Sequence, residues 1–312
     1  MTRPKKRPLS PLRPRSTAYR TDLGICLKGK AEEILRSPKI AMHLKHKVDL
    51  IFTSPPFPLN RKKKYGNLKG NAYVDWLATF ADTFKLLLKP KGSIIIELGN
   101  AWVQGKPAMS TLALKALLAL LEKGNFTLCQ QLIWYNPARL PSPAQWVNVE
   151  RIRLKDAYTH LWWMSRTDRP LANNRNVLTE YSDSMKDLLR KQKYNTGKRP
   201  SEHKIGEKSF LKNNAGAIPS NVITLSNTLS NTEYQAYCRE QDLHPHPARM
   251  PPGLAEFFIK FLTKPNMLVL DPFAGSNTTG AAAEKLGRRW IAIEPQDDYI
   301  SGSRGRFNGN II

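Results

Sequence analysis

One run of the sequence, DPFAGSNTTG at 271–280, combines an acid, a glycine and small polar residues between a short apolar segment and a helical one. Gly275 allows a tight turn and lets a ligand approach where a Cβ would block it. Three residues that follow it can cap the helix and leave N–H groups free to bind a carboxylate: Ser276, Asn277 and Thr278. Asp271 can neutralise an ammonium. The run therefore suits a ligand with both groups, such as the methionine part of S-adenosylmethionine.

A second acid, Glu294, comes 23 positions after Asp271, at the end of the next predicted strand. Acids in that place hold ribose hydroxyls in Rossmann-like sites. The sequence contains no GxGxxG and no GxxxxGK[ST], which disfavours a nicotinamide cofactor and a phosphate loop. A Gly-rich turn alone can be purely structural, but the complete run of strand, DPFAGSNTTG, helix, strand and acid is far more specific.

The other chemically unusual strand end is Thr53-Ser54-Pro55-Pro56-Phe57. An exocyclic amine on a nucleobase is a poor nucleophile, so its methylation needs acceptors that hold the amine hydrogens. Ser54 Oγ and the Pro55 carbonyl can be those acceptors, and Pro55 and Pro56 stiffen the backbone that carries them. Phe57 offers a face on which an extruded base can stack. A plain Pro-rich turn is the structural alternative.

Strands and helices alternate from about residue 23 onward. Short apolar runs predict strands at 48–52, 93–98, 127–135, 157–164, 267–270 and 290–293, and helical spacing predicts helices at 72–88, 109–121, 254–262 and 278–286. This alternation favours an α/β fold with a doubly wound, mostly parallel sheet. Ligands bind such sheets at the carboxyl ends of strands, which is where both motifs lie.

The charge of the chain points to a polyanionic partner. Among 312 residues, 49 Lys and Arg against 25 Asp and Glu give a net charge of +24. Nucleic acid is the usual partner of so basic a protein. Three separated cysteines and a lone His244–His246 pair indicate neither a disulfide framework nor a metal site. No signal peptide or membrane span is expected, which fits an intracellular location.

The two motifs together resemble those of amino-methylating DNA methyltransferases. The catalytic motif precedes the cofactor motif, which is the circularly permuted order of their β class. Further stretches resemble the PvuII-type N4-cytosine methyltransferases of restriction–modification systems: 61–67, 134–146, 151–163 and 246–262. The resemblance covers roughly residues 21–310. It implies a Rossmann-like fold, S-adenosylmethionine as cofactor and double-stranded DNA as substrate, with base flipping and no metal.

The resemblance also implies roles for individual residues. Ser54, Pro55 and Phe57 would hold the flipped base, with Pro56 beside them. The cofactor residues would be Thr53, Pro247, Arg249, Asp271, Phe273, Gly275, Ser276, Asn277 and Thr278, with Glu294 on the ribose. One departure is that the family often has Gly-Asp where this chain has Gly29-Lys30. Ser in the first catalytic position goes mostly with cytosine N4 and Asp mostly with adenine N6, so adenine stays open. Carbon-5 methylation needs a Pro-Cys, which is absent.

Four segments are expected: a disordered basic arm at 1–20, which a nuclear-targeting signal could also explain, a catalytic part at 21–170, a target-recognition region at 171–245 and a cofactor-binding part at 246–312. The expected DNA contacts are Arg61, Lys62, Lys63, Lys64, Arg199, His203, Asn213 and Asn214. The expected protein is a monomer or weak dimer in a prokaryotic cytoplasm, associated with the nucleoid. The rival hypotheses are an adenine-N6 enzyme of the same fold, a DNA-binding relative without turnover and, more weakly, an enzyme acting on RNA.

Overall fold

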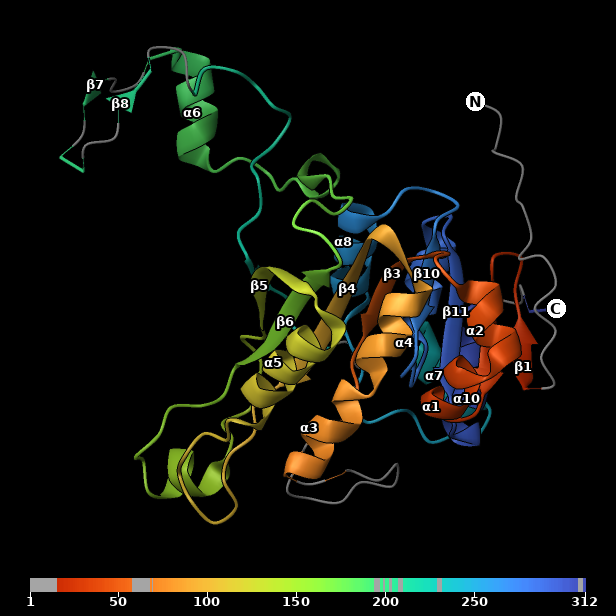
Figure 1. Ribbon diagram of the computed structural model, residues 1–312. Coiled ribbons are helices and arrows are strands. Elements are labelled where there is room, and N and C mark those ends of the chain that lie inside the picture. Colours follow the sequence, from red (N-terminus) through yellow and green to blue (C-terminus); the bar gives the residue numbers. More distant parts are fainter. Residues whose placement is uncertain are drawn as a thin grey trace. The chain divides into compact units, whose positions relative to one another are not determined.

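The computed structural model describes residues 16–57, 68, 70–193, 197–198, 200–201, 204–206, 210–228, 232–307 and 311–312. The chain divides into two compact units, one made of Met1–Ala172 with Asn221–Ile312 and the other of Asn173–Ser220. Figure 1 shows the secondary structure of both.

The larger unit is built on one mixed sheet, which in the described residues has the strand order β1-β2-β11-β10-β3-β4-β6-β5-β9. Its strands are β1 (Thr17–Arg20), β2 (Gly24–Lys28), β3 (Val48–Thr53), β4 (Leu88–Gly99), β5 (Thr127–Tyr135), β6 (Tyr158–Ser165), β9 (Val222–Thr224), β10 (Leu268–Asp271) and β11 (Arg289–Glu294). The five neighbours from β2 to β4 are mutually parallel. Their carboxyl ends therefore meet at one edge, as the alternation of strands and helices predicts.

Helices cover both faces of this sheet. The helices are α1 (Ala31–Arg36), α2 (Pro38–Leu44), α3 (Asn71–Ala78), α4 (Phe80–Leu87), α5 (Leu112–Gly124), α7 (Glu233–Glu240), α8 (Pro252–Leu262), α9 (Thr278–Lys285) and α10 (Asp297–Ser303). Alternate residues of a strand face opposite sides. Ile94 and Ile96 of β4 accordingly join the core under α1 to α5, whereas Ile95 joins the core under α8 and α9.

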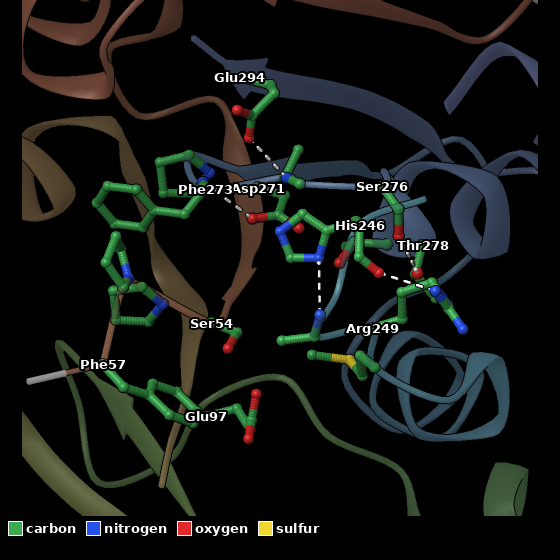
Figure 2. A pocket seen from close by; sticks show the side chains of 18 of the residues that line it. Ser54, Phe57, Glu97, His246, Arg249, Asp271, Phe273, Ser276, Thr278 and Glu294 are labelled. Atoms are coloured by element: carbon green, nitrogen blue, oxygen red, sulfur yellow. Dashed lines mark hydrogen bonds between the residues drawn. The ribbon is translucent and has the colours of Figure 1, made fainter. Parts of the chain in front are cut away.

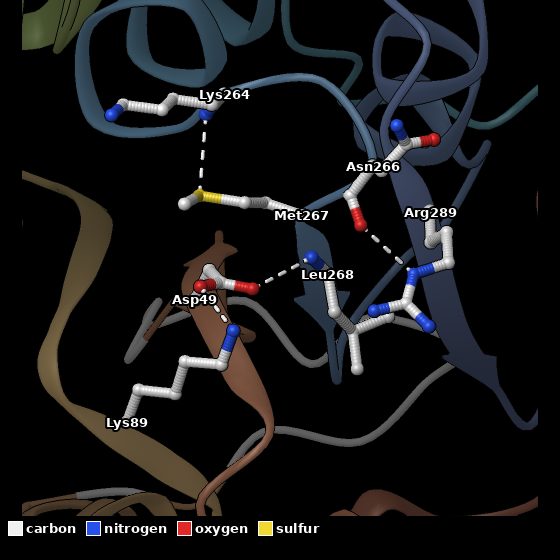
Figure 3. A network of polar contacts seen from close by, with 7 residues as sticks. All are labelled: Asp49, Lys89, Lys264, Asn266, Met267, Leu268 and Arg289. Carbon is white, nitrogen blue, oxygen red and sulfur yellow. Dashed lines mark hydrogen bonds and ion pairs between the residues drawn. The ribbon is translucent and has the colours of Figure 1, made fainter. Parts of the chain in front are cut away.

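A polar network fixes β3 and β10 at the edge opposite their carboxyl ends (Figure 3). The buried carboxylate of Asp49 accepts the backbone N–H of Leu268 at 2.9 Å and pairs with Lys89 Nζ at 2.7 Å. A buried carboxylate with both a backbone donor and a cation keeps its charge satisfied. This network holds the register in which Thr53 and Asp271 come together at the other end.

The structure confirms the predicted α/β fold class and differs from the expected element boundaries in places. The helix expected at 72–88 is divided into α3 and α4 at Thr79, whose hydroxyl donates to the carbonyl of Trp76 at 2.7 Å. Such a local hydrogen bond competes with the helix ladder. The expected helix at 109–121 begins at Leu112 and ends after Gly124, where Asn125 adopts φ 46°.

The end of the disordered basic arm expected at 1–20 is ordered instead, because Thr17–Arg20 form β1 against β2. Tyr19 is the reason: its ring is buried against Trp290 and Phe307, and its hydroxyl contacts Ser303 Oγ at 2.6 Å. One buried aromatic residue among basic and polar ones is a weak signal in a sequence. Residues 1–15 lie outside the described residues.

The smaller unit, Asn173–Ser220, contains helix α6 (Asp183–Lys191) and the short strands β7 (Gly197–Lys198) and β8 (Lys204–Ile205). The Ser182 hydroxyl caps α6 by accepting the backbone N–H of Met185. The recognition region expected at 171–245 includes this unit. Residues 221–228 and 232–245 belong to the larger unit, where β9 pairs with β5 and α7 packs beside Arg304–Arg306. The assignment of target recognition to this region stays a prediction.

Candidate active site

A pocket of about 650 Å³ lies at the carboxyl ends of the parallel strands (Figure 2). Residues that follow β3, β10 and β11 line it, together with residues of β4 and of the β5–β6 loop. Its size falls within the range of small-molecule sites, about 300–1,000 Å³. The two strand ends that the sequence analysis singled out thus open into one cavity.

Asp271 lines this pocket from the end of β10. Its Oδ1 accepts the Thr53 hydroxyl at 2.6 Å and the backbone N–H of Phe273 at 3.1 Å. Burial raises the pKa of Asp271 to about 6, against the opposing effect of these hydrogen bonds. A buried carboxyl held in this way is prepared to receive a positively charged group.

Glu294, at the end of β11, fixes two neighbouring turns. Its Oε2 accepts the backbone N–H of Gly275 at 2.9 Å and its Oε1 accepts that of Gln296, also at 2.9 Å. Burial raises the pKa of Glu294 to about 7, while these two bonds lower it. Because each carboxylate oxygen has a second acceptor position, Glu294 can still bind hydroxyl groups from the pocket.

Two features of position 275 favour glycine: a positive φ and a lack of space for a Cβ. Its φ is 52°, and a Cβ there would lie 3.0 Å from Nε2 of His246. The His246 ring itself packs edge-on against Tyr299, with ring centroids 4.3 Å apart. Gly275, His246 and Tyr299 all line the pocket. The absence of a Cβ on Gly275 therefore leaves room for the imidazole and lets a ligand approach the backbone beside it.

The catalytic motif faces a carboxyl group that the sequence analysis did not identify. Glu97 of β4 is 5% exposed and lines the pocket with Ser54. Burial raises the pKa of Glu97, and the hydroxyls of Ser54 and Thr159 and the charge of Arg139 counteract this. Figure 2 shows the Ser54 hydroxyl and the Glu97 carboxyl directed toward each other. A base with a raised pKa beside a hydroxyl can take up a proton through it.

Phe57 stands beside these groups at the pocket wall, together with Pro55 and Pro56. Its ring lies so close to Gly99 that a Cβ on Gly99 would be 2.6 Å from it. Gly99 ends β4 directly after Glu97 and Leu98, so the strand that carries the acid also seats the aromatic ring. The lining thus combines polar groups with an aromatic ring, as pockets that read a flipped base do.

The structure brings most of the predicted cofactor residues to the pocket: Arg249, Asp271, Phe273, Gly275, Ser276, Thr278 and Glu294 all line it. Three others are not among its lining residues. The Thr53 hydroxyl lies behind Asp271. Asn277 has φ 53°, accepts the N–H of Gly280 at 3.1 Å and donates to the Tyr19 hydroxyl at 2.9 Å. Pro247 follows His246 in the chain. The turn that contains it is closed by the Arg249 guanidinium, which donates to the His246 carbonyl at 2.8 Å.

Most of the predicted DNA-contact residues lie outside the described part of the chain. Arg61, Lys62, Lys63, Lys64, Arg199 and His203 lie outside the described residues. Asn213 and Asn214 are in the smaller unit, where Asn213 Oδ1 accepts the N–H of Ala215 and the Asn214 N–H donates to the Tyr181 hydroxyl. Both asparagine side chains are exposed. Their role in DNA binding stays a prediction.

Several pocket residues lay beyond the motifs: Lys30, Glu32, Trp76, Glu97, Trp134, Asn136, Arg139 and Thr159. Glu97 could have been found, because a lone carboxylate inside the apolar run SIIIEL must have a reason to be buried. Lys30, the departure from the family's Gly-Asp, does line the pocket. Two positions on, Glu32 also lines it and accepts the Trp76 indole N–H at 2.6 Å.

Comparison with known proteins decides the family. A family model described as DNA methylase, covering N6 and N4 enzymes, matches residues 48–304. This chain belongs to that family. It is 44% identical to the type II methyltransferase M.PvuII of Proteus hauseri over 95% of this chain and 87% of that protein. It is 26% identical to M.BglII of Bacillus subtilis over 81% of this chain and 61% of that protein.

One solved structure agrees with this assignment, and a second shares the fold. The PvuII DNA methyltransferase, whose title specifies cytosine N4, superimposes with a TM-score of 0.74 at 37% identity over 94% of this chain and 89% of that one. A complex of M1.HpyAVI with SAM matches with a TM-score of 0.54 at 21% identity, over 92% of this chain and all of that one. The second likeness concerns the fold alone. The predicted family membership is confirmed.

In the described ranges, no helix is long and apolar enough to cross a membrane. Within the same residues, no three or more His, Cys, Asp or Glu side chains are grouped so as to hold a metal ion.

Proposed function

We propose that this DNA methylase transfers a methyl group from S-adenosylmethionine to N4 of cytosine in double-stranded DNA, as the modification enzyme of a restriction–modification system. The observation that carries the proposal is the position of Ser54 and Glu97 in the same pocket as Asp271 and Glu294. The 44% identity to a type II methyltransferase and the likeness to a cytosine-N4-specific enzyme support the choice of base.

The residues present fit the proposed cofactor. Asp271 offers a buried carboxyl for an ammonium, and the turn from Gly275 to Thr278 precedes a helix N-terminus suited to a carboxylate. Glu294 has acceptor positions left for ribose hydroxyls. Phe273 and Trp76, with ring centroids 5.5 Å apart, offer apolar surface on the lining for an adenine ring. When bound, S-adenosylmethionine supplies an electrophilic methyl group.

The chain's own residues then act on the target amine. Ser54 Oγ and the Pro55 carbonyl accept its hydrogens and direct the nitrogen lone pair out of the ring plane. Methyl transfer makes the nitrogen positively charged, and the nitrogen then releases a proton. Either Glu97 accepts this proton directly, or the Ser54 hydroxyl takes it up while giving its own proton to Glu97. The raised pKa of Glu97 makes it a better base than an exposed carboxylate. Phe57 holds the extruded base by stacking.

Lys30 separates this pocket from the family pattern, in which an acid often follows the glycine. We infer that Glu32, which lines the pocket beside Trp76, provides the acidic group on this side. A net charge of +24 favours binding of the DNA backbone. An enzyme with this substrate in a prokaryote would work in the cytoplasm next to the chromosome.

The test is mass spectrometry of nucleosides from unmethylated plasmid DNA incubated with the protein and S-adenosylmethionine. N4-methylcytosine is the expected product, and sequencing of the same plasmid maps the target site. The matched control is Ser54→Ala, which should lose turnover while its affinity for the cofactor stays close to that of the wild type. N6-methyladenine would replace the proposed base by the alternative one. Cofactor binding without any modified nucleoside would favour a relative that binds DNA without turnover.

A further inference from the structure

The loop between β5 and β6, residues 136–157, exposes large aliphatic side chains to solvent. Leu140 is 81% exposed, Leu154 89%, Val149 69% and Ile152 62%. In Figure 1 the loop projects beyond the ends of the two strands. Scattered apolar residues are ordinary on a surface, but a group of four on one loop is typical of a surface that another molecule covers.

The loop is held by packing and by hydrogen bonds. The buried Trp146, midway along it, meets Trp102 of the segment after β4 edge-on, with ring centroids 6.3 Å apart. Backbone hydrogen bonds close it from Ile152 N to the Trp146 carbonyl at 3.0 Å and from Asp156 N to the Ser142 carbonyl at 3.1 Å. The exposed leucines therefore stand on a braced support, not on a segment that could fold back to bury them.

Two of these residues lie next in sequence to residues that line the pocket or are bonded to its lining stretch. Asn136 and Arg139, at the start of the loop, line the pocket, and Leu140 follows directly. Lys155 Nζ donates to the carbonyls of Arg139 at 3.1 Å and Pro137 at 3.3 Å, so the sequence neighbour of Leu154 is tied to the same stretch. We call Leu140 and Leu154 the rim leucines.

The charged residues next to the rim leucines favour DNA as the molecule that covers them. Cations alternate with aliphatic residues in the segment Arg151-Ile152-Arg153-Leu154-Lys155. Arg153 is engaged by Asp156 at 3.1 Å, whereas Arg151 is exposed at a turn with φ 58°. Apolar wedges flanked by cations are the means by which proteins enter a base step of duplex DNA while contacting its phosphates. A second protein chain would not need this alternation.

We propose that the rim leucines form a wedge that enters duplex DNA next to the target base and occupies the space that the flipped base leaves. This rests on the proposed function, since it concerns the same pocket and a base in DNA. Filling that space stabilises the open duplex, because the stacking lost when the base leaves is partly replaced. Arg151 contacts the DNA phosphate backbone beside this wedge.

The test compares Leu140→Ala/Leu154→Ala with the wild type on a duplex that carries the mapped target site, with the target cytosine either paired with guanine or opposite adenine. The variant should lose roughly tenfold or more in kcat/KM on the paired duplex. It should recover to within about threefold of the wild type on the mismatched one, where extrusion is already easy. Its cofactor affinity and melting temperature should not change, because both side chains are exposed.

The matched control is Leu114→Ala/Leu118→Ala, which removes two exposed leucines from α5 and should leave both duplexes unaffected. Leu154→Ser gives the same readout if the double variant fails to fold. Unchanged kcat/KM, or an equal loss on both duplexes, would overturn the wedge. So would a wild-type dimer that becomes a monomer in the variant, because a second copy would then cover the leucines.

Failure of the proposed function has a different signature, namely absence of methylated nucleoside from the wild type. In that case fluorescence anisotropy with a short random-sequence duplex decides the question. Weaker binding by the rim variant than by the α5 control would support the contact with DNA, and equal binding would contradict it.

Discussion

The Thr53 hydroxyl donates to Oδ1 of Asp271 at 2.6 Å, although the two are 218 positions apart in the chain. Thr53 ends the strand that carries the catalytic motif, and Asp271 ends the strand that carries the cofactor motif. The bond is buried and connects the two motifs of the candidate active site directly. It lowers the pKa of Asp271 against the effect of burial, so Thr53 would influence the proposed cofactor site although it does not line the pocket.

Thr53→Val should therefore weaken cofactor binding without changing the shape of the core. Loss of the donor leaves the Asp271 carboxylate less well satisfied, which should cost about 1–3 kcal/mol of unfolding free energy and raise the pKa of Asp271 further. Calorimetric titration with S-adenosylmethionine and thermal melting measure the two effects. Thr53→Ser, which keeps the hydroxyl, is the control. Valine and serine variants with the same affinity would show that the hydroxyl does not matter.

Glu97→Gln should separate catalysis from binding. Removing the proton acceptor should lower kcat by about 100-fold or more while the cofactor affinity stays nearly constant. The unfolding free energy should not fall, because a buried carboxyl is replaced by a neutral amide of the same shape.

The pH profile provides an independent readout of Glu97. Its raised pKa places the acidic limb of the wild-type kcat above the ordinary range of Glu, and the limb should disappear in Glu97→Gln. A variant that keeps the limb would assign it to another group.

Cofactor affinity should rise with pH. An ammonium and ribose hydroxyls bind the ionised forms of Asp271 and Glu294, whose pKa values are raised to about 6 and about 7. The affinity should therefore increase as the pH passes through these values. Titration calorimetry across this range measures it, and in Glu294→Gln only the lower step should remain. An affinity independent of pH would mean that neither acid meets the ligand in its ionised form.

The same shifts affect stability in the opposite direction. Since the folded state holds the proton of Glu294 more tightly than the unfolded chain does, the unfolding free energy of the ligand-free protein should fall as the pH rises from 4.5 to about 7. Glu294→Gln should flatten that dependence in denaturant titrations. A wild-type curve equal to that of the variant would contradict the raised pKa.

Asn277→Ala should reduce stability more than it reduces cofactor affinity. The side chain caps α9 and donates to Tyr19, and the backbone adopts φ 53°. The loss of these bonds should cost about 1–2 kcal/mol, with strain added for alanine. Asn277→Gly relieves the strain but not the lost bonds, so its melting temperature should lie between those of wild type and alanine. A large loss of affinity with unchanged melting would instead indicate direct contact with the ligand.

The local motifs could be recognised without a structure because each is continuous in the chain. DPFAGSNTTG and TSPPF each combine an apolar strand with a turn whose residue types limit its chemistry, and the strand–helix alternation fixes which edge of the sheet they share. Family and fold class followed from these signals, and most of the predicted cofactor residues line one pocket.

Only the tertiary structure decided which residues far apart in the chain come into contact. Glu97 becomes a catalytic candidate only because parallel pairing of β3 and β4 brings it beside Ser54. Asn277 faces Tyr19 because β1 folds against the sheet, which no local pattern specifies. The exposure of the rim leucines follows from the β5–β6 loop, whose backbone hydrogen bonds leave both side chains in solvent. Side-chain chemistry is encoded residue by residue, but which groups meet is determined by long-range strand pairing and packing.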